Sequence, residues 1–144
     1  MIPSLTCEKV PALERSAGRV LVIDSEALVR WSLSAGLRQA GYTTETASTA
    51  EDALRLARVE PHFDAVLFDS RLPDCNPSIL LRRLRAIAPD CRFLMMTTEG
   101  HDVPRAPYDV AIVRKPFDLP DVIRQVDAQV TRAARHDTIP RMPR

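Results

Sequence analysis

The sequence lacks any apolar run long enough to cross a membrane, and no apolar stretch near its start resembles a signal peptide. It also lacks an excess of either charge, because 20 Lys and Arg residues stand against 19 Asp and Glu residues. A nearly balanced charge gives no bulk attraction to nucleic acid or to a membrane surface. We therefore expect a cytoplasmic protein that contacts neither membrane nor nucleic acid directly.

Cysteine and lysine are also scarce. Cys7, Cys75 and Cys91 are odd in number and lack metal-site spacing, so we expect a reducing compartment. Lys9 and Lys115 are the only lysines, and every other basic residue is an arginine. A compact ammonium retained at position 115 marks Lys115 as a candidate for a specific role.

Apolar strands and amphipathic helices alternate from residue 19 to about 135, a length sufficient for one domain with a core. The strands are predicted at 19–24, 42–47, 63–68, 92–96 and 109–113. The helices are predicted at about 25–40, 48–60, 77–88 and from 118 onward. This alternation indicates a parallel sheet covered on both faces. Residues 1–17 and 136–144 are interpreted as an N-terminal extension and a C-terminal tail.

Helix ends and breaks carry local signals. Gly41 is expected to follow the end of the first helix. The segment Ser48-Thr49-Ala50-Glu51 has the pattern of a capping box at the start of the second. A glycine and two prolines in 100–107 leave room for at most a turn or two of helix between the last two strands.

Chemically active side chains stand where strands end. Asp24 follows the first strand, Asp69 the third and Thr97 the fourth, and the fifth leads into Arg114-Lys115-Pro116. The carboxyl ends of parallel strands meet at one rim of an open α/β sheet, where such sheets bind ligands. We expect two acids, a hydroxyl and an amine to converge there.

These motifs resemble the receiver domain of two-component response regulators. The resemblance covers about residues 18–135 and rests on VLVIDSE at 20–26, FDSRLP at 68–73, MTTE at 96–99 and VRKPF at 113–117. It implies a flavodoxin-like, doubly wound, five-stranded parallel sheet of order 2-1-3-4-5. It also implies phosphoryl transfer from a histidine kinase to one Asp with the help of Mg²⁺.

The resemblance assigns roles by position. Asp69 is the implied phosphoacceptor, and Asp24, Asp69 and the backbone carbonyl of Arg71 are the implied Mg²⁺ ligands. Lys115 is implied to pair with the phosphoryl oxygens, and Thr97 to hydrogen-bond one of them and report phosphorylation. The Lys115–Pro116 bond is implied to be cis. Independently of the family, Mg²⁺ prefers oxygen ligands, and phosphoryl transfer needs positive charge around the equatorial oxygens.

Three departures separate this chain from the family pattern. Ser25 stands where the family places a metal-binding acid, which predicts weaker Mg²⁺ binding unless Glu26 substitutes. Ile112 stands where the family has a switch aromatic. The segment that forms the family's fourth helix is shortened and broken by prolines. The usual dimer through that helix and the fifth strand is therefore not expected in its standard form.

Each residue also has a plain structural interpretation. Asp24 could be a helix N-cap, Glu26 a first-turn acid favoured by the helix dipole, and Thr97 an ordinary strand-end hydroxyl. Trp31 lies opposite the inner stripe of the first helix, one turn after Leu28. It marks either a partner surface or a contact with the N-terminal extension.

We therefore expect a receiver domain without an output domain in these residues, acting as a signalling module and not as an enzyme. Its expected partners are a sensor histidine kinase or phosphotransfer protein, a downstream protein and, as a further option, a second copy. The alternative is a pseudo-receiver that binds partners with little or no phosphorylation. A flavin-binding electron carrier of the same topology is disfavoured, because the acidic Asp24–Glu26 segment would repel phosphate.

Overall fold

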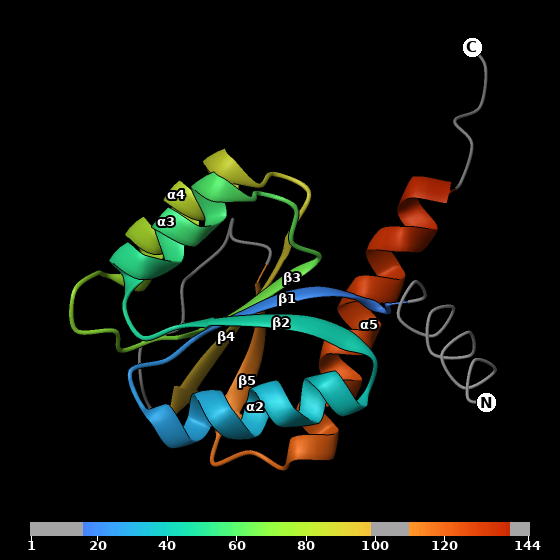
Figure 1. Cartoon of the computed structure of the whole chain (residues 1–144), viewed down its shortest axis with the longest axis horizontal. Helices are drawn as coiled ribbons and strands as arrows, with labels where there is room; N and C mark the ends of the chain where they lie inside the picture. The colour runs from blue at the N-terminus through green and yellow to red at the C-terminus, as the bar shows by residue number, and fades with distance from the viewer. Residues whose placement is uncertain (1–15, 99–109, 139–144) are drawn as a thin grey trace, which may run out of the picture.

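The computed structural model describes residues 16–98 and 110–138, with side chains described to residue 131. Strands alternate with helices along these residues (Figure 1). The strands are β1 (Gly18–Ile23), β2 (Tyr42–Ala47), β3 (Ala65–Asp69), β4 (Arg92–Thr98) and β5 (Val110–Lys115). The helices are α2 (Ala27–Gln39), α3 (Ala50–Val59), α4 (Pro77–Ile87) and α5 (Leu119–Thr138). No helix in this part of the chain is long and apolar enough to span a membrane.

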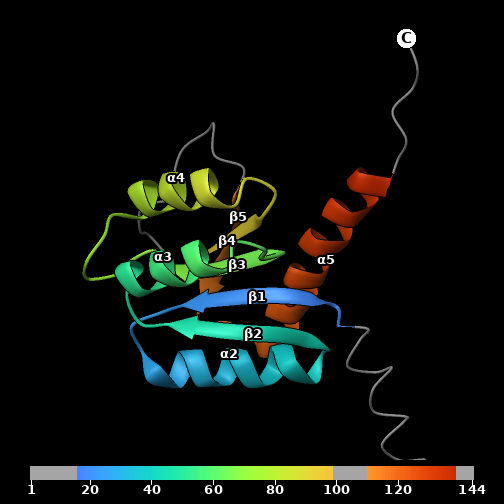
Figure 2. The ribbon, with the colours of Figure 1, turned by 45° about the horizontal axis from the view of Figure 1, so that its top comes forward.

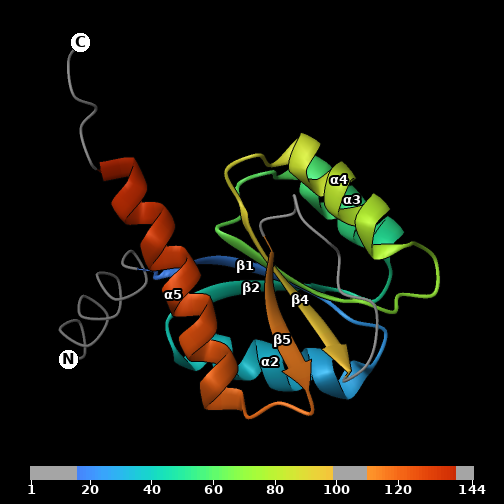
Figure 3. The same ribbon diagram turned by 180° about the vertical axis from the view of Figure 1, so that it is seen from behind.

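The five strands form one parallel sheet of order β2-β1-β3-β4-β5. Helices α3 and α4 cover one face, and α2 and α5 cover the other (Figures 1 and 2). Viewed from behind, β4 and β5 run side by side and α5 crosses the face beside them (Figure 3). The predicted fold class, a doubly wound flavodoxin-like sheet, is confirmed. The predicted break in the fourth helix falls on residues outside those that the structure describes.

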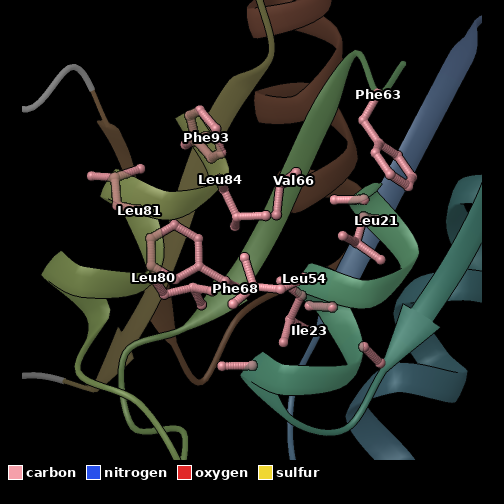
Figure 4. Packing of buried hydrophobic residues seen from close by; sticks show 14 of the residues in the cluster. Leu21, Ile23, Leu54, Phe63, Val66, Phe68, Leu80, Leu81, Leu84 and Phe93 are labelled. Carbon is pink, nitrogen blue, oxygen red and sulfur yellow. The ribbon is translucent and has the colours of Figure 1, made fainter. Parts of the chain in front are cut away.

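Alternation along the strands divides the core into two layers. On the α3/α4 face, Ile23, Phe68 and Leu80 belong to one buried cluster, whose packing Figure 4 shows. On the α2/α5 face, Val22, Leu67 and Leu33 belong to the other. Successive strand residues thus enter opposite layers, as the period of a strand requires. Burial on both faces explains the near-continuous apolar runs of β1 and β3.

The ends of α2 and α3 were predicted with mixed success. Gly41 has φ of +101°, a left-handed conformation suited to glycine, and follows the C-cap Ala40 as expected. The predicted capping box is wrong by one residue, because Thr49 and not Ser48 is the N-cap of α3. The Thr49 side chain accepts a hydrogen bond from the Asp52 backbone N–H at 3.1 Å. Thr49 and Ser48 have similar capping ability, so the sequence alone did not separate them.

Helices α2 and α5 approach each other closely at Gly36. A Cβ atom at this position would lie 2.8 Å from Cδ2 of Leu119, at the start of α5. A larger residue at position 36 would therefore require the Leu119 side chain to shift, and the constraint is one of packing and not of backbone conformation, since the φ of Gly36 is not positive. This contact fixes the helix that follows β1 against the helix that follows β5.

Candidate functional site

Three of the predicted site residues meet at the carboxyl-end rim of the sheet. The Lys115 ammonium donates to Oδ2 of Asp24 at 2.8 Å and to Oδ1 of Asp69 at 3.3 Å. Asp69 ends β3 and Lys115 ends β5, while Asp24 directly follows β1. Parallel pairing through β1, β3, β4 and β5 brings these three ends to the same rim. Strand order predicts that the three residues share one rim of the sheet. It does not predict the contacts of Lys115 with both carboxylates, which the structure shows.

Burial separates the three side chains. Asp24 is fully buried, whereas the side chains of Asp69 and Lys115 are 12% and 15% exposed. Burial by itself would lower the pKa of Lys115, but the hydrogen bond and charge of Asp24 and the charge of Asp69 outweigh it. The pKa of Lys115 is raised as a result, so the ammonium is charged at neutral pH. Of the two carboxylates, Asp69 is the one that keeps some exposure to solvent.

The position of Asp24 is set through its backbone. Its N–H donates to the carbonyl of Ala47 at 3.1 Å, and its carbonyl accepts from Nη1 of Arg30 at 2.7 Å. Its Oδ1 accepts from the backbone N–H of Glu26 at 2.9 Å, while Oδ2 faces Lys115. Glu26, not Asp24, is the N-cap of α2 and has no side-chain cap bond. Asp24 therefore supports the helix start without being its N-cap.

The loop that follows Asp69 is attached to a neighbouring helix. Oδ1 and Oδ2 of Asp74 accept hydrogen bonds from the backbone N–H groups of Ala50 and Glu51, at 2.9 and 3.0 Å. These are first-turn donors of α3, so Asp74 caps that helix from outside it. The same hydrogen bonds lower the pKa of Asp74. The Asp69 loop and the start of α3 are thereby joined.

Thr97 lies near the end of β4, and Arg71 lies in the loop that follows β3. Thr97 is fully buried, and its hydroxyl donates to the carbonyl of Thr98 at 3.2 Å. It stands one residue beyond Met96, the register partner of Asp69. Arg71 is exposed and lies two residues after Asp69 in the loop that follows β3. The predicted roles of both residues stay predictions.

A Mg²⁺ ion fits this donor set only with help from water. Among the residues that the structure describes, no group of three His, Cys, Asp or Glu side chains could hold a metal. Asp24 and Asp69 supply two carboxylates, and Ser25 and Glu26 are both exposed. Magnesium often uses one or two carboxylates and keeps several waters. The pair therefore suits Mg²⁺, with Ser25 leaving it one acid short of the family pattern.

Three further expectations concern one peptide bond, Ile112, and the apolar pair Leu28 and Trp31 on α2. The Lys115–Pro116 peptide bond is cis, as the family resemblance implied. Ile112 is partly buried and packs against the core cluster on the α3/α4 face. Leu28 and Trp31 are 74% and 70% exposed, so neither contributes to the core. The N-terminal extension, which is the alternative contact for Trp31, lies mostly outside the described residues.

Sequence reasoning missed two residues that shape the site, Arg30 and Asp74. Arg30 lies six positions after Asp24, a spacing that carries no helix or strand signal. Asp74 lies 24 residues from the helix donor that it caps. The Pro73-Asp74 step within the loop that follows Asp69 is the one sequence signal for Asp74, and it indicates a turn only.

Comparison with known proteins gives a consistent result. The family model of the response regulator receiver domain matches residues 20–127. Transcriptional regulatory protein PrrA of Mycobacterium leprae is 32% identical over 122 residues, which cover 81% of this chain and 52% of PrrA. A putative transcriptional regulator of Haloferax volcanii is 27% identical, covering 92% of this chain and 23% of its own length. The chain thus spans about a quarter to a half of these two relatives.

A solved structure with a similar fold is a CheY-like response regulator receiver domain protein from Methanospirillum hungatei. It has a TM-score of 0.73 and 25% identity, and the alignment covers 82% of this chain and 97% of that one. The similarity therefore extends over almost the whole of that structure.

Proposed function

Because this chain belongs to the response regulator receiver domain family, we propose that Asp69 accepts a phosphoryl group from a histidine kinase or phosphotransfer protein. The observation that carries the proposal is Lys115, which contacts both Asp24 and Asp69 at the rim of the sheet. A charged amine beside a reachable carboxylate suits a reaction in which negative charge arrives on that carboxylate. Receiver domains are signalling modules, so the outcome is a changed protein surface.

The proposed transfer is a displacement at phosphorus. An oxygen of the Asp69 carboxylate attacks the phosphorus atom of a phosphohistidine, and a P–O bond forms as the P–N bond breaks. The bonding electron pair returns to the histidine nitrogen of the donor, and Asp69 becomes an acyl phosphate. Lys115 offsets charge on the phosphoryl oxygens, and the Thr97 hydroxyl turns from the Thr98 carbonyl to donate to one of them.

Asp24, Asp69 and the carbonyl of Arg71 are the residues proposed to hold Mg²⁺. When bound, the ion supplies positive charge that offsets the two carboxylates and the phosphoryl oxygens. Fully buried Asp24 is fixed at its backbone by Ala47 and Arg30, so it is preorganised as a ligand. Ser25 contributes no charge, which predicts weak affinity for the ion.

The proposed signalling unit is residues 18–135, with 1–17 and 136–144 as flanking segments, and the proposed location is the cytoplasm. Its output is proposed to pass through protein contacts and not through direct binding of nucleic acid or membrane. The exposed apolar pair Leu28 and Trp31 on α2 is the candidate contact surface, for a protein partner or for a homodimer.

Labelling with acetyl phosphate and Mg²⁺ tests the function. Mass spectrometry is expected to find one adduct on Asp69 that is stable to acid and labile to base and hydroxylamine. Asp69→Ala should abolish it, whereas Asp90→Ala, at an exposed acid in the turn before β4, should leave it unchanged. Undiminished labelling of Asp69→Ala would overturn the assignment. A wild-type protein that takes no label would favour the pseudo-receiver alternative.

A further inference from the structure

A cavity of about 350 Å³ lies between the starts of α2 and α3 and the end of β2, and two of its lining residues bond the backbone of Asp24. Figure 2 shows these two helix starts at the same end of the molecule as the ends of β1 and β2. Arg30 and Arg55 line the cavity, with Thr46, Ser48 and Asp52. Its volume lies within the range of small-molecule sites. None of these residues is proposed to contact the phosphoryl group, although Arg30 also holds the backbone of Asp24.

The charge of this cavity favours an anion. The lining of the cavity contains two guanidinium groups and one carboxylate. The carboxylate, Asp52, pairs with Arg55 one helical turn away, so the lining keeps one excess positive charge. Of the five N–H donors of Arg30, the bond to the Asp24 carbonyl uses one. A guanidinium presents its donors in a fork that matches a carboxylate or a phosphate. The side chains of Thr46 and Ser48 add hydroxyl donors to the same wall.

The backbone donors of α3 do not account for this preference. The N–H groups of Ala50 and Glu51 are taken by Asp74, and that of Asp52 is taken by Thr49. An anion in the cavity would therefore be held by side chains, the two arginines above all. Single substitutions of these arginines therefore test the predicted preference of the cavity for anions.

The cavity is directly connected to Asp24. The Asp24 N–H donates to Ala47 and its carbonyl accepts from Arg30, and both of these partners line the cavity. On the other side, Asp74 joins the start of α3 to the loop that follows Asp69. A ligand that draws the Arg30 guanidinium toward itself must alter the bond that positions Asp24.

We propose that this cavity binds a small organic anion, a carboxylate or a phosphate monoester, and that its occupancy shifts Asp24. Anion binding would then be a second signal that the chain receives besides phosphorylation. The two are connected because Arg30 both lines the cavity and bonds Asp24, the acid proposed to bind the metal. The effect on phosphorylation rests on the function proposed for Asp69, whereas the binding itself does not.

The binding test uses the whole chain and two probes, glycerol 3-phosphate and succinate, with neutral glycerol as the control ligand. Amide resonances of Thr46, Ser48 and Asp52 should shift saturably with one or both anions and not with glycerol. The probe that binds more tightly identifies the source as phosphate or carboxylate. Absence of saturable shifts with both anions would overturn the proposal.

Three arginine variants locate the binding. Arg55→Gln and Arg30→Gln should each weaken it about tenfold or more, the size expected for losing a charged hydrogen bond. Arg58→Gln removes the same charge from an exposed position on α3 outside the cavity and should change nothing. Arg55 is 68% exposed and supports no loop, so its variant stays informative if Arg30→Gln unfolds. Equal affinity in Arg55→Gln and wild type would refute the site.

The connection to Asp24 has its own readout. The anion should also shift the amide resonances of Ser25 and Glu26, and this remote shift should disappear in Arg30→Gln. Shifts confined to the cavity would overturn the coupling. The rate of Asp69 labelling with the anion present is measured last. A protein that never labels but shows the shifts refutes the function proposed for Asp69 and leaves the anion site standing.

Discussion

The loop after β1 and the loop after β3 each present one carboxylate to Lys115, but they are fixed in different ways. Asp24 is buried and held through its own backbone by Ala47 and Arg30. Asp69 ends a strand and stays partly exposed, and its loop is attached through Asp74 to α3. The difference suits two tasks, since a metal ligand benefits from a fixed position and a nucleophile from access.

Removing the shared cation should produce the largest effect. Lys115→Met leaves two carboxylates, one of them fully buried, without their positive partner. We expect a loss of about 3 kcal/mol in the free energy of unfolding, measured by urea denaturation. Adding Mg²⁺ should restore part of the loss by supplying the missing charge.

Arg114→Met is the matched control, because Arg114 is an exposed neighbour of Lys115 on the same strand. It should change the unfolding free energy by less than about 0.5 kcal/mol. Equal losses in both variants would mean that Lys115 does not hold the two loops together.

Restoring an acid to the first loop should bring its metal affinity closer to the family pattern. Ser25→Asp adds a third carboxylate beside Asp24, and we expect Mg²⁺ to bind about tenfold more tightly, or about 1.4 kcal/mol. Titration calorimetry measures the change. Glu26→Gln is the companion variant: if it weakens binding in the wild-type background, Glu26 already substitutes for the missing acid. Equal affinity of Ser25→Asp and wild type would place Ser25 away from the metal.

Releasing the loop that follows β3 should lower the free energy of unfolding by less than the loss of Lys115 does. Asp74→Ala removes the cap from the Ala50 and Glu51 N–H groups and should destabilise the fold by about 1 kcal/mol. The pKa of Asp74 is lowered in the folded state. Its contribution is therefore complete above the ordinary aspartate pKa and is lost as the pH falls through the lower, folded value.

Urea denaturation at several pH values tests this. The difference between wild type and Asp74→Ala should be constant near neutral pH and shrink in acid. Asp121→Ala, at an exposed first-turn acid of α5, provides a control at another helix start. A difference between wild type and Asp74→Ala that does not change with pH would contradict the charged cap.

The smallest effect on folding is expected on the helix that follows the first loop. Trp31→Ala should change the unfolding free energy by less than about 0.5 kcal/mol, because the side chain is 70% exposed. It should still weaken self-association, measured by sedimentation, or phosphotransfer from a partner kinase. Ile79→Ala tests the same type of change on α4, after the second loop, where exposure is 40%. Equal effects of the two variants on association would remove the special role of α2.

Sequence patterns predicted the parallel sheet and the placement of Asp24, Asp69 and Lys115 at one rim of it. Both predictions depend on the periodicity of the strands. Parallel strands that end in Asp24, Asp69 and Lys115 must bring those residues to one rim. Arg30 and Asp74 could not be found in this way. Their contacts join separate elements, and only the packed helices define them. A tertiary contact also bears on the misplaced cap of α3, because Asp74 takes the Glu51 N–H that the capping-box pattern assigned to Ser48.

The edge strand β2 also determines how this protein can meet others of its kind. Thr43 and Thr46 are exposed along it, and Glu45 stands between them beside Arg19. A charged, hydroxyl-bearing margin is a poor template for adding another strand. Extension of the sheet by pairing of β2 with another copy is therefore disfavoured. Concentrated solutions of the protein are therefore not expected to form fibrils that grow through β2.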